Sequence, residues 1–541
     1  MTDSMQQMAL DTLGAYFGYT SFRPGQDRMV DAILAGRDAL GVMPTGAGKS
    51  ICYQVPALML PGITFVVSPL LSLMEDQTRA LLAAGARPSY LNSSLTPAQQ
   101  NTVLKRAREG RYQLMYVAPE RLLEPRFLAF AQEAAGSAGI GVPLVAIDEA
   151  HCVSQWGQDF RPAYLQIREF IDSLPQRPIV AAFTATATER VRADIQQMLG
   201  LQNPATVVTG FDRKNLYFGC EEMGDKAKTA WVRDYVIAHS SESGIVYCST
   251  RKTVDALAGE LAEALGPSGI RVGRYHAGMG NDARRQSQRA FIDDDIQVMV
   301  ATNAFGMGID KPNVRFVIHY NMPKDLESYY QEAGRAGRDC QPSRCTLLYS
   351  GTDVRTIRFF IDKELEADNG LPADVKAEAA RKAEERLKYM TFYSTTPKCL
   401  RGFLLEYFGE AAPKKCGNCS CCLAAEQEAQ LQLETSRRRA ADNAHRLEKP
   451  RRTKSTAGAA PLSEADEKLL NALYARRKWL AGKQNVPAFM VFSDATLREM
   501  VEKKPLSLDE LLNISGVGEK KAARYGTTFL RIIEDAVENR E

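Results

Sequence analysis

Short apolar segments bounded by turn residues alternate with longer amphipathic segments through about the first 350 residues of the chain. This alternation predicts an α/β fold in which parallel strands are buried between helices. The apolar segments form two series, one before and one after Gly210–Asn215, which we interpret as a hinge. The segments predicted as buried strands are Ala39–Met43, Thr64–Ser68, Gln113–Val117, Leu144–Ile147, Ile179–Phe183, Gly244–Cys248, Val298–Ala301 and Phe316–His319.

The pattern becomes helical and charged from Arg355 to Tyr407, just before a cluster of cysteines. Residues from about Ala424 to Pro461 are rich in Ala, Glu, Gln, Arg and Lys, which is typical of a partly helical, partly flexible linker. A last helical block follows. We therefore expect domains at residues 1–208, 209–350, 351–423 and 461–541, with a charged flexible linker at 424–460.

Composition limits the class of protein. With 541 residues the chain is too long for one core, and its 45% apolar and 25% charged residues are typical of a soluble globular protein. The net charge of +3 is close to neutral, so any surface for a polyanion must be local. The N-terminus lacks the features of a signal peptide, and no apolar run approaches the ~20 residues that span a bilayer. The 11 cysteines do not form a disulfide framework, which indicates a reducing cytosol.

A candidate phosphate-binding loop, Met43-Pro-Thr-Gly-Ala-Gly-Lys-Ser50, follows the first predicted strand. Gly46 and Gly48 allow the main chain to curl so that successive N–H groups face phosphates, and the next helix points its positive end at them. Lys49 is expected to neutralise the β- and γ-phosphates, and the Ser50 hydroxyl to hold Mg²⁺. The first glycine of the general pattern is absent, so the flanking strand and helix carry part of the evidence.

Two carboxylates, Asp148 and Glu149, directly follow an apolar strand and therefore emerge at a carboxyl edge of the sheet. Asp148 is placed to bind Mg²⁺, and Glu149 to orient the attacking water. The alternative, an exposed acidic loop, is disfavoured by the phosphate loop upstream.

A separate arginine motif, Gln331-Glu-Ala-Gly-Arg-Ala-Gly-Arg338, lies in the second predicted domain. Arg335 and Arg338 are three residues apart on a predicted helix, which would place both on one face. Planar guanidinium groups suit the spread charge of a phosphoryl-transfer transition state, so both are predicted to complete the ATP site. A solvated basic face is the alternative, and Gly334 and Gly337 argue against it because helix surfaces avoid glycine.

These motifs, in this order, resemble superfamily 2 helicases and specifically the RecQ family of DNA helicases, over about the first 420 residues. The resemblance implies two tandem RecA-like parallel-sheet domains, then a small helical zinc-binding module and a C-terminal all-α bundle. The other motifs that carry it are Phe17–Gln26, Phe183–Thr188, Tyr247–Thr250, Tyr275–Gly278 and Ala304–Asp310. It implies an ATP and Mg²⁺ site made of Tyr19, Arg23, Gln26, Thr45, Gly46, Gly48, Lys49, Ser50, Asp148 and Gln331.

By this resemblance Tyr19 should stack on adenine, with Arg23 and Gln26 at the edge of the base. The Gln26 amide offers both a donor and an acceptor, which suits adenine. A glutamine that stabilises a turn would look the same in the sequence.

Residues His151–Pro162 resemble the family's aromatic-rich loop, which senses single-stranded DNA. Trp156 and Phe160 offer stacking faces worth about 1–3 kcal/mol per base, and Arg161 is expected to meet a phosphate or the nucleotide. The alternative for Trp156 is to anchor the loop to the core. The remaining residues expected to bind DNA or couple it to the ATP site are Thr184, Thr186, Thr250 and His276.

Four thiols have the spacing of metal ligands, in Cys399-x16-Cys416-Gly-Asn-Cys419-Ser-Cys-Cys422. A tetrahedral Zn²⁺ with four thiolates is the expected solution, and it can supply about 10–16 kcal/mol of apparent binding energy to a small module. The resemblance assigns Cys399, Cys416, Cys419 and Cys422 as the ligands and leaves Cys421 as a bystander. We expect this metal to stabilise the fold and not to catalyse.

Many RecQ proteins carry a winged-helix domain of roughly 100 residues after the zinc site, but here only the linker intervenes, which is too short for one. Basic clusters at Ser436–Arg439 and Lys449–Lys454 either contact phosphates or belong to a soluble spacer. The last block resembles an HRDC domain. Its Gly516-Val-Gly518 turn, near Lys520, Lys521 and Arg524, either binds a DNA phosphate or is a tight helix–helix turn.

The resemblance implies an ATP-dependent DNA helicase with 3′→5′ polarity, acting in DNA repair and recombination. Because the winged helix is missing, an ATP-gated DNA-binding or annealing factor with weak unwinding is one alternative, and an RNA helicase is another. The expected partners are single-stranded and tailed or branched DNA, with single-strand-binding or repair proteins as candidates and no membrane. We expect a cytoplasmic, nucleoid-associated monomer that uses ATP, Mg²⁺ and Zn²⁺.

In the aromatic-rich loop, Gln158 stands where the family usually has histidine. Because glutamine cannot carry a positive charge and histidine can, Gln158→His should change the stimulation of ATPase activity by DNA. ATPase rates of both proteins at saturating single-stranded DNA measure this, and equal stimulation would contradict the prediction.

Overall fold

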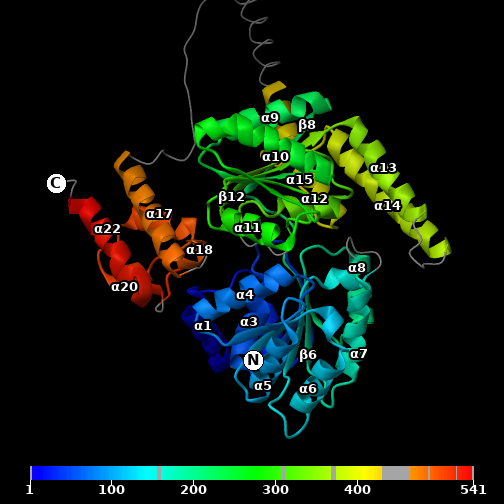
Figure 1. The fold of residues 1–541 in the computed structure, drawn as a ribbon, viewed down its shortest axis with the longest axis vertical. Helices are drawn as coiled ribbons and strands as arrows, with labels where there is room; N and C mark the ends of the chain where they lie inside the picture. The colour runs from blue at the N-terminus through cyan, green and yellow to red at the C-terminus, as the bar shows by residue number, and fades with distance from the viewer. Residues whose placement is uncertain are drawn as a thin grey trace, which may run out of the picture.

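The structure, a computed structural model, describes residues 3–154, 160–306, 311–366, 373–428, 464–484, 488–518 and 521–538. Two sheet-containing lobes are stacked in Figure 1, with a helical hairpin on one side of the upper lobe and a helical bundle on the other side of the molecule. In these residues, no helix has both the length and the apolar composition needed to cross a membrane.

The first lobe is built on a seven-stranded parallel sheet with strand order β3-β4-β2-β5-β6-β1-β7. Every side chain of β1, β2, β4 and β5 is buried, as expected where helices cover both faces of a parallel sheet. The strands are β1 (Ala39–Val42), β2 (Thr64–Val67), β3 (Pro88–Leu91), β4 (Leu114–Val117), β5 (Leu144–Ile147), β6 (Ile179–Thr184) and β7 (Ala205–Val208). The α-helices are α1 (Asp3–Phe17), α2 (Gln26–Leu34), α3 (Lys49–Met59), α4 (Leu71–Ala83), α5 (Pro97–Arg108), α6 (Pro125–Ala135), α7 (Gln166–Asp172) and α8 (Glu189–Met198).

The second lobe has a six-stranded parallel sheet with strand order β10-β11-β9-β12-β13-β8. Its strands are β8 (Leu216–Glu222), β9 (Ser243–Tyr247), β10 (Val272–Tyr275), β11 (Val298–Ala301), β12 (Val314–His319) and β13 (Ser343–Tyr349). Its helices are α9 (Asp225–Ala238), α10 (Arg251–Leu265), α11 (Asn281–Ile292) and α12 (Leu326–Ala333).

The predicted α/β class, with two tandem parallel-sheet domains, is confirmed, and all eight predicted strands are present within a residue or two of their expected bounds. The apolar pattern missed the four edge strands, β3, β7, β8 and β10, and also β13. Edge strands are covered less completely, so polar residues interrupt their apolar runs, as in the half-exposed β7.

The predicted zinc-binding module follows the second sheet. Its helices α13 (Gly351–Glu366) and α14 (Ala373–Thr395) form the hairpin at the right of Figure 1, and α15 (Leu400–Tyr407) leads into the cysteine-rich segment. That segment lies against the edge strand β8, where Phe218 forms a backbone bridge with Cys419 and the Cys220 N–H donates to the Ser420 hydroxyl at 3.2 Å.

The C-terminal bundle has its own core, which includes Leu473, Phe492 and Phe529. It contains α17 (Glu464–Gln484), α18 (Ala488–Val491), α19 (Asp494–Lys503), α20 (Leu508–Leu512), a π-helical turn (Ala522–Gly526) and α22 (Thr527–Glu538). Most of the predicted linker, residues 429–460, lies outside the described residues, and so do both of its basic clusters.

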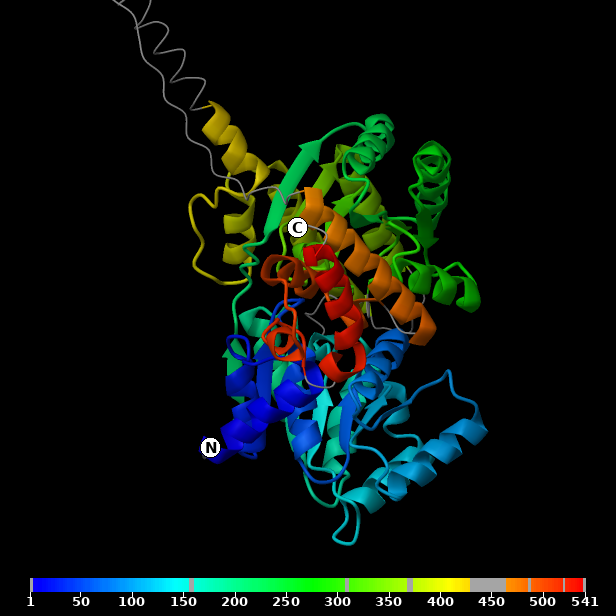
Figure 2. The same ribbon diagram turned by 90° about the vertical axis from the view of Figure 1, so that its left-hand side faces the viewer.

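The bundle contacts both lobes, as the side view in Figure 2 shows. A Cβ atom placed on Gly518 would lie 2.9 Å from the Gly18 Cα atom, at the end of α1 in the first lobe. Lys478 of α17 pairs with Asp295 of the second lobe at 3.1 Å. The turn predicted to bind a DNA phosphate therefore lies against the main chain of the first lobe in this structure, one residue before Tyr19. Of the basic residues near that turn, Lys520 lies outside the described residues.

Gly518→Ala is expected to detach the bundle, because the new methyl group would meet the Gly18 Cα atom and the Gly14 carbonyl, which are both main chain and cannot rotate away. Small-angle scattering should show a larger radius of gyration. Gly482→Ala on α17 is the matched control, since nothing lies within 4 Å of its new methyl group. Equal radii for the two variants would contradict the docking.

Candidate functional site

The phosphate loop connects β1 to α3, so the predicted strand–loop–helix arrangement is confirmed. Gly46 and Gly48 have φ angles of +86° and +80°, in the left-handed region that favours glycine. Lys49, the first residue of α3, donates from Nζ to the Met43 carbonyl at 3.2 Å. Burial lowers the pKa of Lys49, and the nearby Glu149 and Asp148 carboxylates oppose that shift. The loop is therefore shaped to receive phosphates, and Lys49 faces the acidic pair.

Residues before α2 support the phosphate loop from outside. Arg23 Nη1 donates to the Gly46 carbonyl at 2.5 Å. The buried Gln26 accepts from the Arg23 N–H at 2.8 Å and donates to the Ala47 and Gly48 carbonyls, each at 3.0 Å. Gln26 therefore makes the stabilising contacts that the sequence allowed as an alternative to adenine recognition. The adenine contacts of Tyr19, Arg23 and Gln26 stay predictions.

The acidic pair emerges at the carboxyl end of β5, as predicted. Burial and the neighbouring Glu149 raise the pKa of the Asp148 carboxyl to about 7. A divalent cation would relieve this destabilised carboxylate, and carboxylate and hydroxyl oxygens are ligands that Mg²⁺ prefers. Asp148, together with the half-buried Ser50 across the loop, therefore fits a Mg²⁺ site.

Glu149 is linked to the end of β6 through a histidine. Glu149 has a φ angle of +48°, which turns the chain directly after the strand. One of its carboxylate oxygens lies 3.3 Å from His151 Nδ1, and that nitrogen lies 2.9 Å from the Thr184 hydroxyl. Thr184 in turn accepts from the Thr186 N–H at 3.3 Å. Both threonines are buried, so their side chains have almost no surface that DNA could contact. Their hydrogen bonds instead suit a role in coupling DNA binding to the ATP site.

The two arginines of the second lobe do not share a helical face, so that prediction is wrong. Helix α12 ends at Ala333, because Gly334 caps it and Gly337 has a φ angle of +56°. The buried Arg335 donates to the Gly306 carbonyl within its own lobe. A Cβ atom placed on Gly46 would instead lie 3.4 Å from the Arg338 Cα atom. Only Arg338 is thus brought against the phosphate loop, and a transition-state role for Arg335 stays a prediction.

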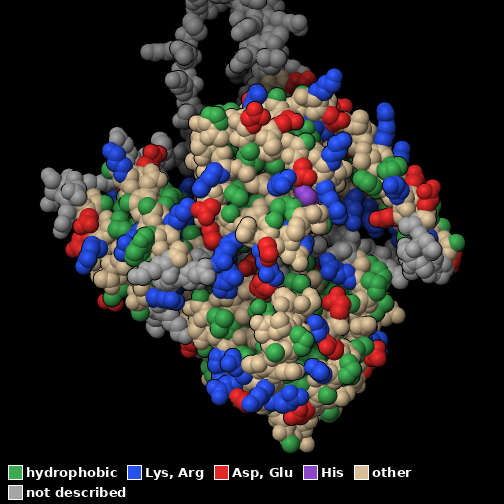
Figure 3. Space-filling model, in the orientation of Figure 1, with side chains coloured by type: hydrophobic (Ala, Val, Ile, Leu, Met, Phe, Trp, Pro, Cys, Tyr) green, Lys and Arg blue, Asp and Glu red, His purple; other side chains and the backbone are tan. Residues whose placement is uncertain are grey.

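The residues expected to meet DNA are spread over both lobes. Trp156 and Gln158 lie outside the described residues. Phe160 is half-buried, and Arg161 donates from Nη1 to the Pro69 carbonyl at 3.2 Å. On the face shown in Figure 3, Lys and Arg side chains lie on both lobes near the boundary between them.

Two further predicted DNA contacts lie at the carboxyl edge of the second sheet. Thr250 caps α10 by accepting from the Thr253 N–H at 3.1 Å. His276, one residue after β10, lies 3.1 Å from Asp255 through its Nε2 atom, and this hydrogen bond lowers the pKa of the Asp255 carboxyl. The contacts of both residues with DNA stay predictions.

The four predicted metal ligands come together. The sulfur atoms of Cys399, Cys416, Cys419 and Cys422 lie within 4.8 Å of one another. Main-chain N–H groups donate to three of these sulfurs, at 3.3 to 3.4 Å. Burial raises the pKa of the Cys419 thiol to about 12, so a thiolate there requires a cation beside it. Four converging thiols, supported by N–H donors, fit a closed structural Zn²⁺ site. Cys421 lies outside this cluster and donates from its thiol to the Thr396 carbonyl at 3.4 Å.

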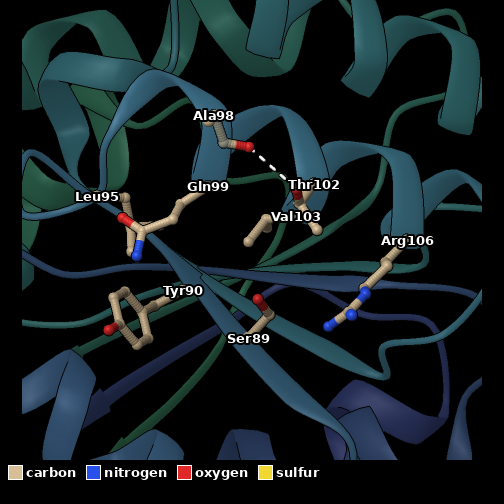
Figure 4. A pocket seen from close by; sticks show the side chains of 8 residues that line it. All are labelled: Ser89, Tyr90, Leu95, Ala98, Gln99, Thr102, Val103 and Arg106. Atoms are coloured by element: carbon tan, nitrogen blue, oxygen red, sulfur yellow. Dashed lines mark hydrogen bonds between the residues drawn. The ribbon is translucent and has the colours of Figure 1, made fainter.

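A pocket of about 390 Å³ lies away from all these residues, between the edge strand β3 and helix α5 (Figure 4). Tyr90 and Ser89 line it from the strand, and Gln99 and Arg106 from the helix. No predicted site residue contributes to it, so it is separate from the nucleotide site.

Two residues at the nucleotide site were missed by sequence reasoning. Arg213 and Asn215 lie in the predicted hinge and donate to main-chain carbonyls of the arginine motif. Such contacts depend on which backbone segments meet in space. The only indication of them in the sequence was that Arg213 and Asn215 have side chains with hydrogen-bond donors and lie in the connection between the two predicted sheets.

Family comparisons agree with this arrangement. Residues 23–195 match the DEAD/DEAH box helicase family, and residues 227–340 match the helicase conserved C-terminal domain. Residues 351–423 match the RecQ zinc-binding family, and residues 466–533 match the HRDC domain.

Two relatives match over almost their whole length. The ATP-dependent DNA helicase RecQ of Bacillus subtilis is 40% identical, with 98% of this chain and 99% of the relative covered. The protein of the same name from Pasteurella multocida is 36% identical, with 98% and 94% covered. The alignment with the Bacillus protein extends over 607 positions although this chain has 541 residues, so at least 66 positions of that relative face gaps here.

Solved structures share the fold at low identity. The Mycobacterium smegmatis helicase Lhr, bound to single-stranded DNA and AMP-PNP, has a TM-score of 0.52 at 17% identity and covers 93% of this chain and 74% of its own. The DEAD-box helicase Mss116 has a TM-score of 0.54 at 16% identity, with 70% and 80% covered. These likenesses support the two-lobed arrangement of parallel sheets.

Cys419→Ser is expected to lose the metal and lower the melting temperature, because a serine hydroxyl stays protonated near neutral pH and binds zinc poorly. Bound zinc measured by elemental analysis, together with thermal unfolding, checks this. Cys421→Ser is the matched control and should keep one zinc per chain. Full zinc occupancy in the Cys419 variant would rule out the assigned ligand set.

Proposed function

The chain belongs to the RecQ family of ATP-dependent DNA helicases, and on that premise we propose that it translocates 3′→5′ on single-stranded DNA and unwinds duplexes in DNA repair and recombination. ATP hydrolysis drives the movement.

The observation that carries the proposal is the approach of Arg338 to the phosphate loop across the boundary between the lobes. A γ-phosphate held by Lys49 from the first lobe would meet Arg338 from the second. Because the γ-phosphate would then contact both lobes, its release after hydrolysis would weaken the contact that holds the lobes closed. An arginine that completes such a site is typically worth about 10³–10⁵ in rate.

The residues of the first lobe have separate tasks in this mechanism. Lys49 and the main-chain N–H groups of the loop bind the phosphates, while Ser50 and Asp148 hold Mg²⁺. The bound Mg²⁺ would neutralise charge that develops on the phosphate oxygens. Glu149 orients the attacking water.

The link from the acidic pair to DNA runs through His151 and Thr184. Glu149 contacts His151, the first residue of the aromatic-rich loop, and His151 contacts Thr184 at the end of β6. A change in that loop on binding a single strand would therefore reach the residue that positions water. We assign stimulation of ATPase by DNA to this route.

The second lobe would carry the strand forward. Thr250 and His276, at its carboxyl edge, are proposed to hold the strand while the lobes open and close. Opening one base-pair step costs about 1.4 kcal/mol of stacking on average, which ATP-driven stepping can supply. Tailed or branched DNA in the cytoplasm is the proposed substrate, and the active form is proposed to be a monomer.

Strand separation would take place without a winged helix. Support comes from the short interval between Cys422 and the bundle and from the gaps that this chain shows against its longer relative. An annealing or clamping factor would hydrolyse ATP without opening duplexes, so one unwinding assay distinguishes the two functions.

The test is unwinding of a duplex with a 3′ single-stranded tail, beside the same duplex with a 5′ tail, with ATPase measured on the same single strand. We expect unwinding of the 3′-tailed duplex only. Lys49→Ala should keep the fold and lose both activities, because the phosphates lose their cation. Strong DNA-stimulated ATPase without unwinding would favour the annealing factor, and equal stimulation by a matched RNA strand would favour an RNA helicase.

A further inference from the structure

The connection between the two sheets passes directly behind the arginine motif. Residues 210–216 leave β7 of the first lobe and enter β8 of the second, and Gly210 has a φ angle of +88° at the start. Arg213 and Asn215 lie in this connection, and both are half-buried.

Arg213 donates to main-chain carbonyls of the arginine motif. Its Nη1 lies 3.2 Å from the Gly334 oxygen, and its Nη2 lies 3.1 Å and 2.8 Å from the Ala336 and Gly337 oxygens. Asn215 adds a second donor to Gly337 at 2.9 Å. Carbonyls just beyond a helix end lack partners within the helix, and a guanidinium group supplies several donors in one plane.

The same guanidinium group also reaches the phosphate loop. Arg213 Nη1 donates to the Thr45 carbonyl, which belongs to the first lobe. A Cβ atom placed on Gly46 would lie 3.3 Å from this Nη1 atom and 3.4 Å from the Arg338 Cα atom. One side chain therefore joins the main chain before Lys49 to the main chain before Arg338.

The zinc-binding module fixes the connection from the other side. The buried Arg401 of α15 donates to the Asp212 carboxylate at 2.7 Å and to the Arg213 carbonyl at 2.8 Å. Phe211 stacks on Phe408 with ring centroids 4.5 Å apart, and its N–H donates to Glu410 at 2.7 Å. Because its backbone is held in this way, Arg213 has a fixed base from which to reach both loops.

We infer that Arg213 is a positioning residue for ATP hydrolysis, which holds the phosphate loop and the arginine motif in register so that Arg338 meets the γ-phosphate. The inference rests on the role of Arg338 proposed above. Arg213 acts through main-chain carbonyls and needs no contact with the nucleotide. Lysine cannot replace it, since an ammonium group cannot present the planar fork that reaches four carbonyls.

The test compares Arg213→Lys and Arg213→Ala with the unaltered protein, measuring kcat and KM for ATP at saturating single-stranded DNA. Small errors in the placement of a catalytic group can cost about 100-fold in rate, so we expect kcat to fall by about that factor. The KM for ATP should change by less than about 3-fold, because the phosphate contacts of Lys49 remain. Thermal unfolding confirms that each variant folds, and the lysine variant is decisive if the alanine variant does not.

Arg177→Ala is the matched control. Arg177 is also an arginine held by several hydrogen bonds, to Asp38 at 2.6 Å and 3.1 Å and to the Gly200 carbonyl at 3.2 Å, but it precedes β6, at the end of the first sheet opposite the phosphate loop. It should keep the kcat of the unaltered protein. A loss of kcat equal to that of Arg213→Ala would show a general effect of removing a structural arginine and would overturn the inference.

A double mutant separates positioning from independent effects. If Arg213 acts through Arg338, adding Arg213→Ala to Arg338→Ala should lower kcat by only a few-fold more, whereas equal losses in both backgrounds would overturn the inference. Unchanged kcat in Arg338→Ala would contradict the proposed function of Arg338 itself. Unchanged kcat in both Arg213 variants, with activity lost in Arg338→Ala, would contradict this inference alone.

Discussion

The contact between the phosphate loop and the arginine motif is the constraint on which the rest of the structure depends. The two segments come from different lobes, and their main chains approach closely, with the Arg213 guanidinium group bonded to both. A Cβ atom on Gly46 would lie 3.4 Å from the Arg338 Cα atom, and one on Gly334 would lie 3.3 Å from the Thr45 Cβ atom. A methyl group at either glycine would already make a tight contact across this boundary, and a bulkier side chain would hold the lobes apart. The glycines that let the loop curl around phosphate thus also let the second lobe close on it.

This close approach explains why the remaining groups lie where they do. In a parallel sheet the carboxyl ends of the strands share one edge, so the phosphate loop and the acidic pair emerge side by side in the first lobe. The second lobe presents its own loops across the boundary. Main chains that meet in this way expose carbonyl groups with no partner in either sheet, and buried carbonyls without hydrogen bonds are costly. Arg213 satisfies four of them at once.

The sequence predicted those parts of the fold and site that depend on local pattern. Strands buried on both faces have continuous apolar runs, so the central strands of each sheet could be found. Edge strands such as β7 mix apolar and polar residues, and they could not. The phosphate loop, the acidic pair and the four cysteines are each contiguous or closely spaced. The predicted end of α12 was wrong because the spacing of Arg335 and Arg338 suits a helix, whereas Gly334 and Gly337 make it costly to continue one. The loop-supporting contacts of Gln26 and the carbonyl contacts of Arg213 involve backbone atoms, which carry no sequence signature.

The zinc-binding module has a structural metal, but it also contacts the chain connection between the two lobes. Through that connection it is linked to the ATP site. Asn418, between two of the ligand cysteines, donates to the Leu216 carbonyl at 3.1 Å, and Arg401 follows the first ligand by two residues. The metal thereby fixes a surface against which residues 211–216 pack. The connection buries little apolar surface of its own, with Phe211 and Leu216 as its buried apolar residues. Its conformation must therefore be imposed from outside. The zinc-binding module supplies that support through contacts with the connection, so the path of the connecting chain stays defined.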